Sequence, residues 1–418
     1  MNNSSSALAS GVRPAGMSWL QSQCRQALLK KLGTLVGTLH LDEQGGSTRI
    51  GSGQQPTARI EVKNPAFFVD LATRGSLGAA TSWMDGAWES DDLTAVFALF
   101  ALNPQLTDTI DRGWSRLAAK AAARFHDRRR NSRSGSRQNI ADHYDLGNDL
   151  FALFLDQGMN YSSAFFSSEE DSLDTAGINK LDRICRKLDL RPSYHVLEVG
   201  SGSGGFAIHA ATHFGCRVTG LTISQEQYDF ATARVAEAGL LDRIDIILCD
   251  YRDHEGTYDR VVSIEMIEAV GHEFLGDYFQ KIQSFLTPAG AALIQAIAMP
   301  DQRYAQYLKG CDFIQRYIFP GSCVPSLGAM TDAVRRRTDL KVVDLEDIAP
   351  HYARTLRLWR RRFNDRMSEV LDLGYPERFV RLWNYYFAYC EAGFAERYLA
   401  DFQILLSRPL WRGSVYRG

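Results

Sequence analysis

From residue 194 onward, short apolar runs alternate with longer stretches of mixed polarity. Apolar runs of this length are typical of buried strands, and the stretches between them are long enough for helices. Strands are predicted over 194–199, 216–221, 244–248, 260–264 and 291–297, and helices over 206–214 and 224–238. Ser224 is a suitable N-cap for the second helix, with Gln227 placed for a capping box. The alternation predicts an α/β fold, with helices covering both faces of a parallel sheet.

The chain before this region has a different pattern. Residues from about 60 to 103 resemble a compact unit with a modest core, to which Leu77, Met84, Trp88 and Phe97 contribute. A polar stretch rich in arginine, serine and glycine follows it and is typical of a linker. We predict a disordered or poorly packed segment (1–34), a small N-terminal domain (35–123), a basic linker (124–137) and a main domain (138–418).

Composition narrows the class of protein. The 418 residues are 45% apolar and 23% charged, as in ordinary globular proteins, and the formal net charge of −2 does not indicate nucleic-acid binding. No apolar run approaches the roughly 18 residues of a transmembrane helix. The first residues lack the features of a signal peptide. Seven scattered cysteines, none in C-x-x-C spacing, are typical of reduced thiols in the cytoplasm.

The strongest local motif is a glycine-rich turn at 200–205, which follows a predicted strand and opens a predicted helix. Its spacing, G-S-G-S-G-G, differs from the dinucleotide-binding pattern, and Glu198 stands shortly before the first glycine. Glycines at such a turn let the backbone approach a ligand closely. With Gly200, Gly202 and Gly204, the motif predicts a site for S-adenosylmethionine, a cationic sulfonium amino acid.

Polar residues after the next two strands are candidates for the rest of the cofactor site. The second strand ends without the acidic residue that usually holds the ribose, so Thr222 and Gln227 are candidates for that role. Both residue types also occur simply as strand-end and capping residues. After the third strand, Asp250 is placed to bind the adenine amino group, and Tyr251 is placed to stack on the ring.

Several further motifs are carried by residues 142–150, 159–165, 220–228, 263–271 and 317–321. Together they closely resemble those of the cyclopropane fatty acid synthases, a family that includes mycolic acid cyclopropane synthases and enzymes that make methyl-branched fatty acids. The resemblance extends over about 61–409. It implies a class I, Rossmann-like methyltransferase sheet with helical insertions for the acyl chain, and it adds Tyr161 and Ser162 to the cofactor site.

The resemblance also implies a bicarbonate ion beside the reacting carbons, and two departures put that ion in doubt. Glu268, Tyr352 and the backbone amides of Ser163 and Ile297 match positions that hold it. Where the family has a histidine, the chain has Gln295, which donates a hydrogen bond but carries no proton or charge near neutral pH. In addition, Glu268 is followed by alanine, where the family usually has histidine.

The resemblance implies methyl transfer to the double bond of an unsaturated acyl chain of a membrane phospholipid. The resulting carbocation requires a dry pocket, and aromatic rings would stabilise it. Aromatic residues expected near the chain are Phe165, Phe166, Phe274, Tyr304, Tyr307, Phe313, Tyr317 and Phe319. Glu268 is the expected base or the residue that orients it. Proton loss from the new methyl group gives a cyclopropane, which is the product that we predict. Loss from a chain carbon gives a methyl-branched alkene, which is the alternative.

Other interpretations stay open from sequence alone. An inactive lipid-binding relative is one, although the intact glycine turn argues against it. The basic stretches at 124–137 and 354–362 are either solvated surfaces or contacts with anionic headgroups. We expect a cytoplasmic protein peripherally associated with the inner face of the membrane, without a nucleic-acid partner, and homo-oligomer formation stays open.

Overall fold

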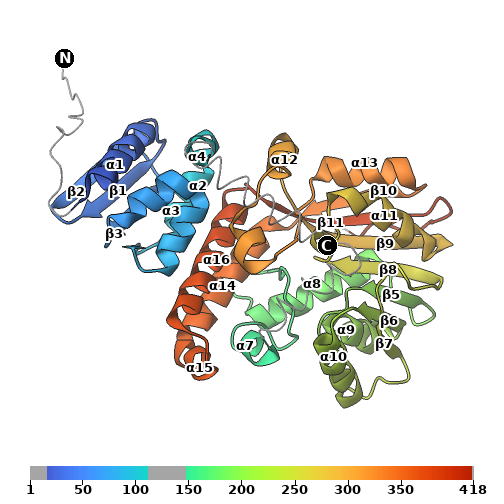
Figure 1. The fold of residues 1–418 in the computed structure, drawn as a ribbon. Coiled ribbons are helices and arrows are strands. Elements are labelled where there is room, and N and C mark those ends of the chain that lie inside the picture. The colour runs from blue at the N-terminus through green and yellow to red at the C-terminus, as the bar shows by residue number, and fades with distance from the viewer. Residues whose placement is uncertain (1–16, 112–146, 417–418) are drawn as a thin grey trace. The chain divides into compact units, whose positions relative to one another are not determined.

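A seven-stranded sheet is the centre of the larger of two compact units in the computed structural model, which describes residues 17–111 and 147–416 (Figure 1). The strand order is β10-β11-β9-β8-β5-β6-β7. The strands are β5 (His195–Val199), β6 (Arg217–Thr222), β7 (Ile244–Leu248), β8 (Tyr258–Ile264), β9 (Leu286–Ala298), β10 (Lys341–Asp347) and β11 (Ala400–Ser407). Strands β5 to β9 pair in parallel, and β11 runs antiparallel to both neighbours.

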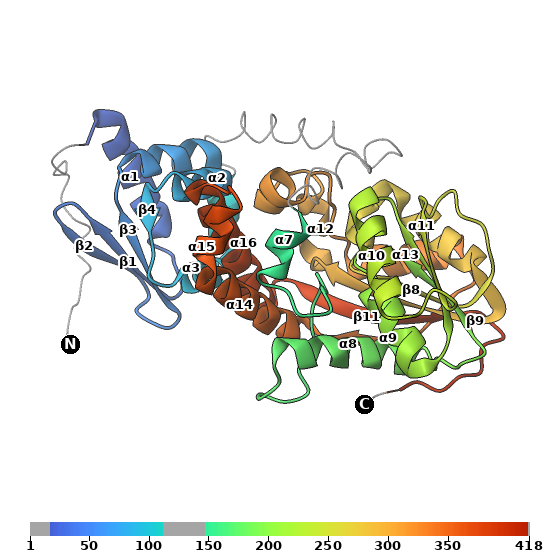
Figure 2. The ribbon, with the colours of Figure 1, turned by 90° about the horizontal axis from the view of Figure 1, so that it is seen from below.

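Each face of this sheet has its own apolar core. On one face, α8 (Leu173–Lys187), α9 (Gly205–Phe214) and α10 (Gln225–Glu237) pack against the strands. Figure 2 shows α8 and α9 side by side. On the other face, α11 (Leu275–Ser284) and α13 (Leu327–Arg337) do the same. Because both faces are covered, the central strands are almost continuously apolar, which is the pattern that predicted them. The mostly parallel α/β sheet confirms the predicted fold class.

Additional helices complete the larger unit. They are α7 (Asn148–Ala152), η1 (Ile267–Ala269), η2 (His272–Phe274), α12 (Asp301–Tyr307), η3 (Ile314–Ile318), α14 (Ala349–Asp365), α15 (Met367–Asp372) and most of α16 (Glu377–Ala395). In the described part of the chain, no helix is long and apolar enough to cross a bilayer.

The smaller unit is built on a second sheet of order β2-β1-β3-β4. Its elements are β1 (Thr38–Glu43), β2 (Gly46–Gly51), β3 (Thr57–Val62), β4 (Trp88–Glu89), α1 (Trp19–Leu32), α2 (Ala66–Met84), α3 (Leu93–Ala101) and α4 (Pro104–Asp111). Among the four residues expected to form its core, Met84 and Trp88 are buried, and Leu77 and Phe97 are partly buried.

Residues 1–34 were expected to be disordered or poorly packed, and helix α1 corrects this expectation for the described part, 17–34. Ser18 caps the helix through a complete capping box, and Cys24, Leu28 and Leu32 are buried. Reciprocal capping satisfies two backbone donors that would otherwise lack partners, which favours an ordered helix at this point. The basic linker at 124–137 and the motif residues before Gly147 lie outside the described residues.

Candidate active site

The glycine-rich turn between β5 and α9 has the left-handed backbone that only glycine adopts freely. The φ angles are +86° at Gly200, +51° at Gly202 and +78° at Gly204. A Cβ atom added at Gly202 would meet no atom within 4 Å, whereas one at Gly200 would lie 2.9 Å from the Cγ of Met266. The backbone at Gly202 therefore faces open space in which a ligand can approach it.

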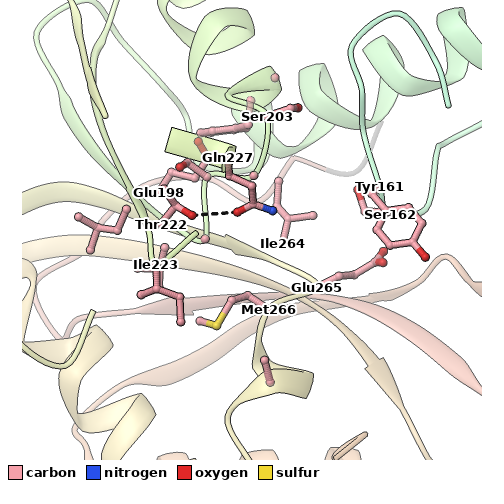
Figure 3. A pocket seen from close by; sticks show the side chains of 18 of the residues that line it. Tyr161, Ser162, Glu198, Ser203, Thr222, Ile223, Gln227, Ile264, Glu265 and Met266 are labelled. Carbon is pink, nitrogen blue, oxygen red and sulfur yellow. Dashed lines mark hydrogen bonds between the residues drawn. The ribbon is translucent and has the colours of Figure 1, made fainter. Parts of the chain in front are cut away.

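A cavity of about 230 Å³ lies along this turn (Figure 3). Nine of the ten residues predicted to bind the cofactor line it: Tyr161, Ser162, Glu198, Gly200, Gly202, Thr222, Gln227, Asp250 and Tyr251. The tenth, Gly204, is not among the lining residues. An added Cβ there would be 3.3 Å from that of Ala231, so this glycine allows close packing of α9 against α10.

Thr222 and Gln227 are joined by a hydrogen bond at the edge of the cavity. The Thr222 hydroxyl donates to Gln227 Oε1 at 2.8 Å (Figure 3). Ser224 caps α10 as predicted and accepts from the Gln227 backbone amide at 3.3 Å. The Gln227 side chain turns to Thr222 instead of completing the expected capping box. Its Nε2 group is consequently oriented as a donor for a hydroxyl such as that of ribose.

Asp250 and Tyr251 occupy the next part of the lining. The Asp250 carboxylate accepts from the backbone amide of Arg252 at 3.0 Å and pairs with its guanidinium at 2.6 Å. This pairing fixes the carboxylate at the cavity wall. The Tyr251 ring contacts that of Tyr278 edge-to-face at 5.7 Å, and burial raises the pKa of its hydroxyl to about 12. Tyr251 therefore presents a neutral, rigid ring.

Two buried titratable groups, the acid Glu198 and the base Lys180, line the cavity near the turn. Glu198 is 3% exposed, and among the described residues its Oε2 has no hydrogen-bond partner. Burial raises its pKa to about 8, an effect that the charge of Lys180 opposes. Lys180 is 1% exposed and donates to the Ser162 hydroxyl at 3.0 Å, and burial lowers its pKa.

Sequence reasoning missed Lys180, although helical spacing could have revealed it. It lies on α8 between Ala176 and Ile184, four residues from each, and both of these residues are fully buried. The open backbone at Gly202 and the unpartnered oxygen of Glu198 fit a cationic amino acid bound along the turn. The residues present thus fit S-adenosylmethionine.

The cavity is also lined by a carboxylate that the sequence analysis did not single out. Glu265 follows β8 directly and lines the same cavity as the glycine turn. Its Oε1 accepts from the Ser163 backbone amide at 2.8 Å and from Gln295 Nε2 at 2.7 Å. Its Oε2 accepts from the Tyr352 hydroxyl at 2.8 Å. Three groups expected to hold bicarbonate therefore hold a side-chain carboxylate of the protein.

Glu268 and Ile297, the other two expected bicarbonate ligands, contact each other. Glu268 Oε1 accepts from the Ile297 backbone amide at 2.6 Å, and Oε2 has no partner among the described residues. Burial raises the pKa of Glu268 to about 8, and the charge of Glu265 adds to this effect. Four of the five predicted residues thus donate to a pair of carboxylates, one of which is the fifth residue, Glu268, and Glu265 accepts three of the four hydrogen bonds.

Aromatic rings surround Tyr161 at the other side of the cavity. Tyr161 stacks on Trp359 at 5.4 Å, and its hydroxyl is 3.1 Å from that of Tyr386. Phe151 and Phe319 also contact its ring, at 5.0 and 6.2 Å. Phe319 was among the aromatic residues expected near the acyl chain. None of those eight residues lines the cavity itself, whose rings come from Phe151, Tyr161, Phe206, Phe230 and Tyr251.

Comparison with known proteins agrees with this geometry. The family model described as mycolic acid cyclopropane synthetase matches residues 131–404, well over half of the chain. The chain belongs to this family. The sequence therefore correctly identified an S-adenosylmethionine-dependent methyltransferase related to the cyclopropane fatty acid synthases.

Two curated relatives are similar over nearly their whole length. A tuberculostearic acid methyltransferase of Mycobacterium tuberculosis is 38% identical over 391 residues, which are 91% of this chain and 90% of the relative. The cyclopropane-fatty-acyl-phospholipid synthase of Escherichia coli is 36% identical over 364 residues, 87% of this chain and 91% of the relative. Among solved structures, the mycolic acid cyclopropane synthase CmaA1 complexed with SAH and CTAB has a TM-score of 0.61 and 29% identity, covering 65% of this chain and 98% of that protein.

Proposed function

We propose that this enzyme methylates the double bond of an unsaturated acyl chain in a membrane phospholipid and releases a methyl-branched, unsaturated chain. The observation that carries the proposal is a single cavity that contains both the glycine turn and the Glu265 carboxylate. A methyl donor and a proton acceptor are the two partners that an alkene needs for this reaction. The similarity to a tuberculostearic acid methyltransferase supports a branched product.

Bound S-adenosylmethionine supplies an electrophilic methyl group on a positively charged sulfur. The protein's own residues bind and orient this group through the turn at Gly200 and Gly202, through Gln227 and through the Tyr251 ring. An alkene is a weak nucleophile, so alignment within the cavity is a large part of catalysis and contributes several kcal/mol. The stacked pair of Tyr161 and Trp359 excludes water on one side and stabilises positive charge by its π faces.

A second candidate product is the cyclopropane. The similarity to the cyclopropane-fatty-acyl-phospholipid synthase favours it, and the same cavity serves both outcomes. The products differ only in which carbon loses the proton. Gln295 favours the branched product, because it replaces a titratable histidine by a group that cannot take part in proton removal.

The function is tested by incubating the protein with S-adenosylmethionine carrying a labelled methyl group and with a defined cis-unsaturated phospholipid. Proton spectra of the labelled lipid then identify the product. A branched alkene keeps a vinylic signal at the modified site, and a cyclopropane loses it. Absence of label in any lipid would refute the proposal, and label in the free fatty acid alone would correct the substrate form.

A membrane location follows from the proposed substrate, since its acyl chains lie within a bilayer. The basic stretch at 354–362 gives this idea little support. Arg354 donates to three backbone carbonyls, Arg357 and Arg360 pair with Glu391, and Arg362 pairs with Asp174. Sedimentation with vesicles of zwitterionic and of anionic phospholipid measures the association, and equal binding to both would exclude a role for these arginines.

A further inference from the structure

Glu265 has a backbone conformation that is uncommon for a glutamate. Its φ angle is +47°, in the left-handed region that side chains other than glycine rarely occupy. Strained residues persist where surrounding contacts hold them, and they are concentrated at functional sites. Three donors from three separate segments hold this side chain: Ser163, Gln295 on β9 and Tyr352 on α14. Figure 3 shows the carboxylate extending toward Tyr161 and Ser162.

We propose that Glu265 is the catalytic base that removes the proton after methyl transfer, a role that no bicarbonate ion then needs to fill. The inference rests on the proposed function, because only an alkene substrate leaves a cation that must lose a proton. Glu268 was the base expected from the sequence. The two carboxylates differ in the hydrogen bonds that they accept, in whether they line the cavity and in the groups that stabilise their negative charge.

The first argument is the availability of a lone pair on Glu265. Each carboxylate oxygen accepts two hydrogen bonds. Oε1 accepts from Ser163 and Gln295, so its capacity is filled. Oε2 accepts from Tyr352, which leaves capacity for one proton. Glu265 lines the cavity that also contains the glycine turn, whereas Glu268 is not among the lining residues.

The second argument is the distribution of charge between the two carboxylates. Hydrogen bonds to a carboxylate favour its ionised form, and burial favours the neutral form. Burial raises the pKa of Glu265, and the three hydrogen bonds that it accepts and the positive charge of Lys180 oppose this effect. Glu268 accepts one hydrogen bond from another residue, the backbone amide of Ile297. Burial, together with the charge of Glu265, raises the pKa of Glu268 to about 8. Asp401, which Gln295 contacts at 3.4 Å, also has a pKa raised by burial. Of the two carboxylates, Glu265 therefore has the surroundings that better stabilise a negative charge.

The reaction balances with this assignment. The π electrons of the alkene form a bond to the methyl carbon, and the electrons of the broken carbon–sulfur bond stay on sulfur. The neighbouring chain carbon becomes positive. Glu265 Oε2 then takes a proton from an adjacent C–H bond, whose electrons form the new double bond. If the proton comes from the transferred methyl group, the same electrons close a three-membered ring. Glu265 later gives its proton to solvent, and no oxidant or reductant is needed.

Two substitutions at this position test the proposal, with Glu255→Gln as the matched control on an exposed loop of the same unit. Glu265→Gln keeps the shape but cannot accept the proton, so turnover should fall by about 10²-fold or more. Affinity for S-adenosylhomocysteine, measured by calorimetry, should stay within about threefold of wild type. The control should behave as wild type in both measurements.

Glu265→Gly removes the carboxylate while glycine accommodates the positive φ angle, so this variant should fold at least as well as wild type. Bicarbonate or formate should restore its turnover by about tenfold or more, since the donors of Ser163, Gln295 and Tyr352 stay in place. Bicarbonate should also raise the melting temperature of this variant and not that of wild type.

Either of two results would overturn the assignment. One is a Glu265→Gln variant whose turnover stays close to that of wild type. The other is a wild-type enzyme that loses most of its turnover when dissolved bicarbonate is removed, since an ion would then be the base. A wild type that binds S-adenosylhomocysteine and methylates no unsaturated lipid would instead refute the proposed function, before any variant is compared.

Discussion

Glu265 and Glu268 lie three residues apart, and burial raises the pKa of both carboxyl groups. The pKa of Glu268 is raised from 4.5 to about 8. Between these values the folded protein keeps a proton that the unfolded chain has lost. The stabilisation from protonated Glu268 is fully present below about pH 4.5 and is lost as the pH rises through about 8.

Replacing Glu268 with glutamine should therefore weaken the pH dependence of stability. Glutamine keeps an acceptor for the Ile297 amide and has no charge to suppress. Urea unfolding of the cofactor-free protein at about pH 5.5 and pH 8.5 is the measurement. Wild type should lose more stability between these values than Glu268→Gln does, and Glu255→Gln should match wild type. Equal losses in wild type and Glu268→Gln would show that Glu268 is ionised throughout.

A substitution at Gly202 tests cofactor binding, because a control glycine can account for the effect of the positive φ angle. Gly202→Val should reduce the affinity for S-adenosylhomocysteine by about tenfold or more, because the new side chain enters the space in front of the turn. Gly239→Val is the matched control, since Gly239 also has a positive φ angle and open space around its Cβ but does not line the cavity. Unchanged affinity in folded Gly202→Val would place the cofactor elsewhere.

At the scale of single residues, the sequence pointed to the glycine turn and did not single out the Glu265 carboxylate. Gly200 and Gly202 were predictable because a strand, a glycine turn and a helix follow one another in the chain. Glu265 and Glu268 appear in one apolar stretch as two similar acids. The one that reaches Tyr352 does so because Glu265 has a left-handed backbone angle and because Tyr352 on α14, 87 residues away, lies beside it. Neither feature is visible in a local sequence pattern.

Among the elements, helix α14 determines the position of the segment that holds Ser163. Thr355 Oγ1 accepts from the Ala164 backbone amide at 3.1 Å, and His351 Nδ1 accepts from that of Phe166 at 3.1 Å. The two acceptors are four residues apart and so lie on one face of the helix. The segment therefore provides the Ser163 donor to Glu265, and helix α14 provides the Tyr352 donor.

Thr355→Val should break one of these attachments without changing the volume of the side chain. It leaves the buried amide of Ala164 without an acceptor, which costs about 1–3 kcal/mol. Chemical denaturation measures the loss of stability, and turnover should fall with it as the Ser163 donor shifts. Thr331→Val on α13 is the control, because that hydroxyl donates only within its own helix among the described residues. Equal effects at both sites would contradict this role of α14.

The central strands and their helices were predictable because each is a continuous segment with a strong pattern. The strand predicted over 291–297 is longer in the structure, where β9 begins at Leu286. Strands β10 and β11 were not predicted. The sequence of β10 is partly exposed along its length, so it lacks the apolar run typical of a central strand.

In the whole molecule, every residue assigned to the cofactor site belongs to the larger unit. Binding of S-adenosylhomocysteine should therefore slow amide hydrogen exchange in residues 199–206 and 221–227, because ligand binding suppresses local opening. Exchange in β1 and β3 of the smaller unit should stay unchanged. Hydrogen exchange with mass spectrometry, with and without ligand, measures both regions. Equal protection in β1 would contradict a site confined to the larger unit.

The extent of the smaller unit shows what a sequence pattern cannot provide. We placed the small N-terminal domain in one stretch, 35–123. Among the described residues, the smaller unit contains 17–111 and, in addition, Glu377–Tyr385 at the start of α16. Arg381 in this part donates to the Trp83 carbonyl at 2.6 Å, and its guanidinium lies over the Trp83 ring. Because these two residues are 298 positions apart, no local sequence pattern in either segment indicates their contact.

The left-handed backbone of Glu265 has an evolutionary consequence. Codons for glutamate and glycine differ by a single nucleotide, and a position with a φ angle of +47° is one where glycine is conformationally the easier residue. One mutation could thus convert an enzyme that carries its own base into one that borrows a dissolved anion, or the reverse. A lineage with glutamate at this position would modify its lipids at a rate independent of environmental carbon dioxide, and one with glycine would be tied to that supply.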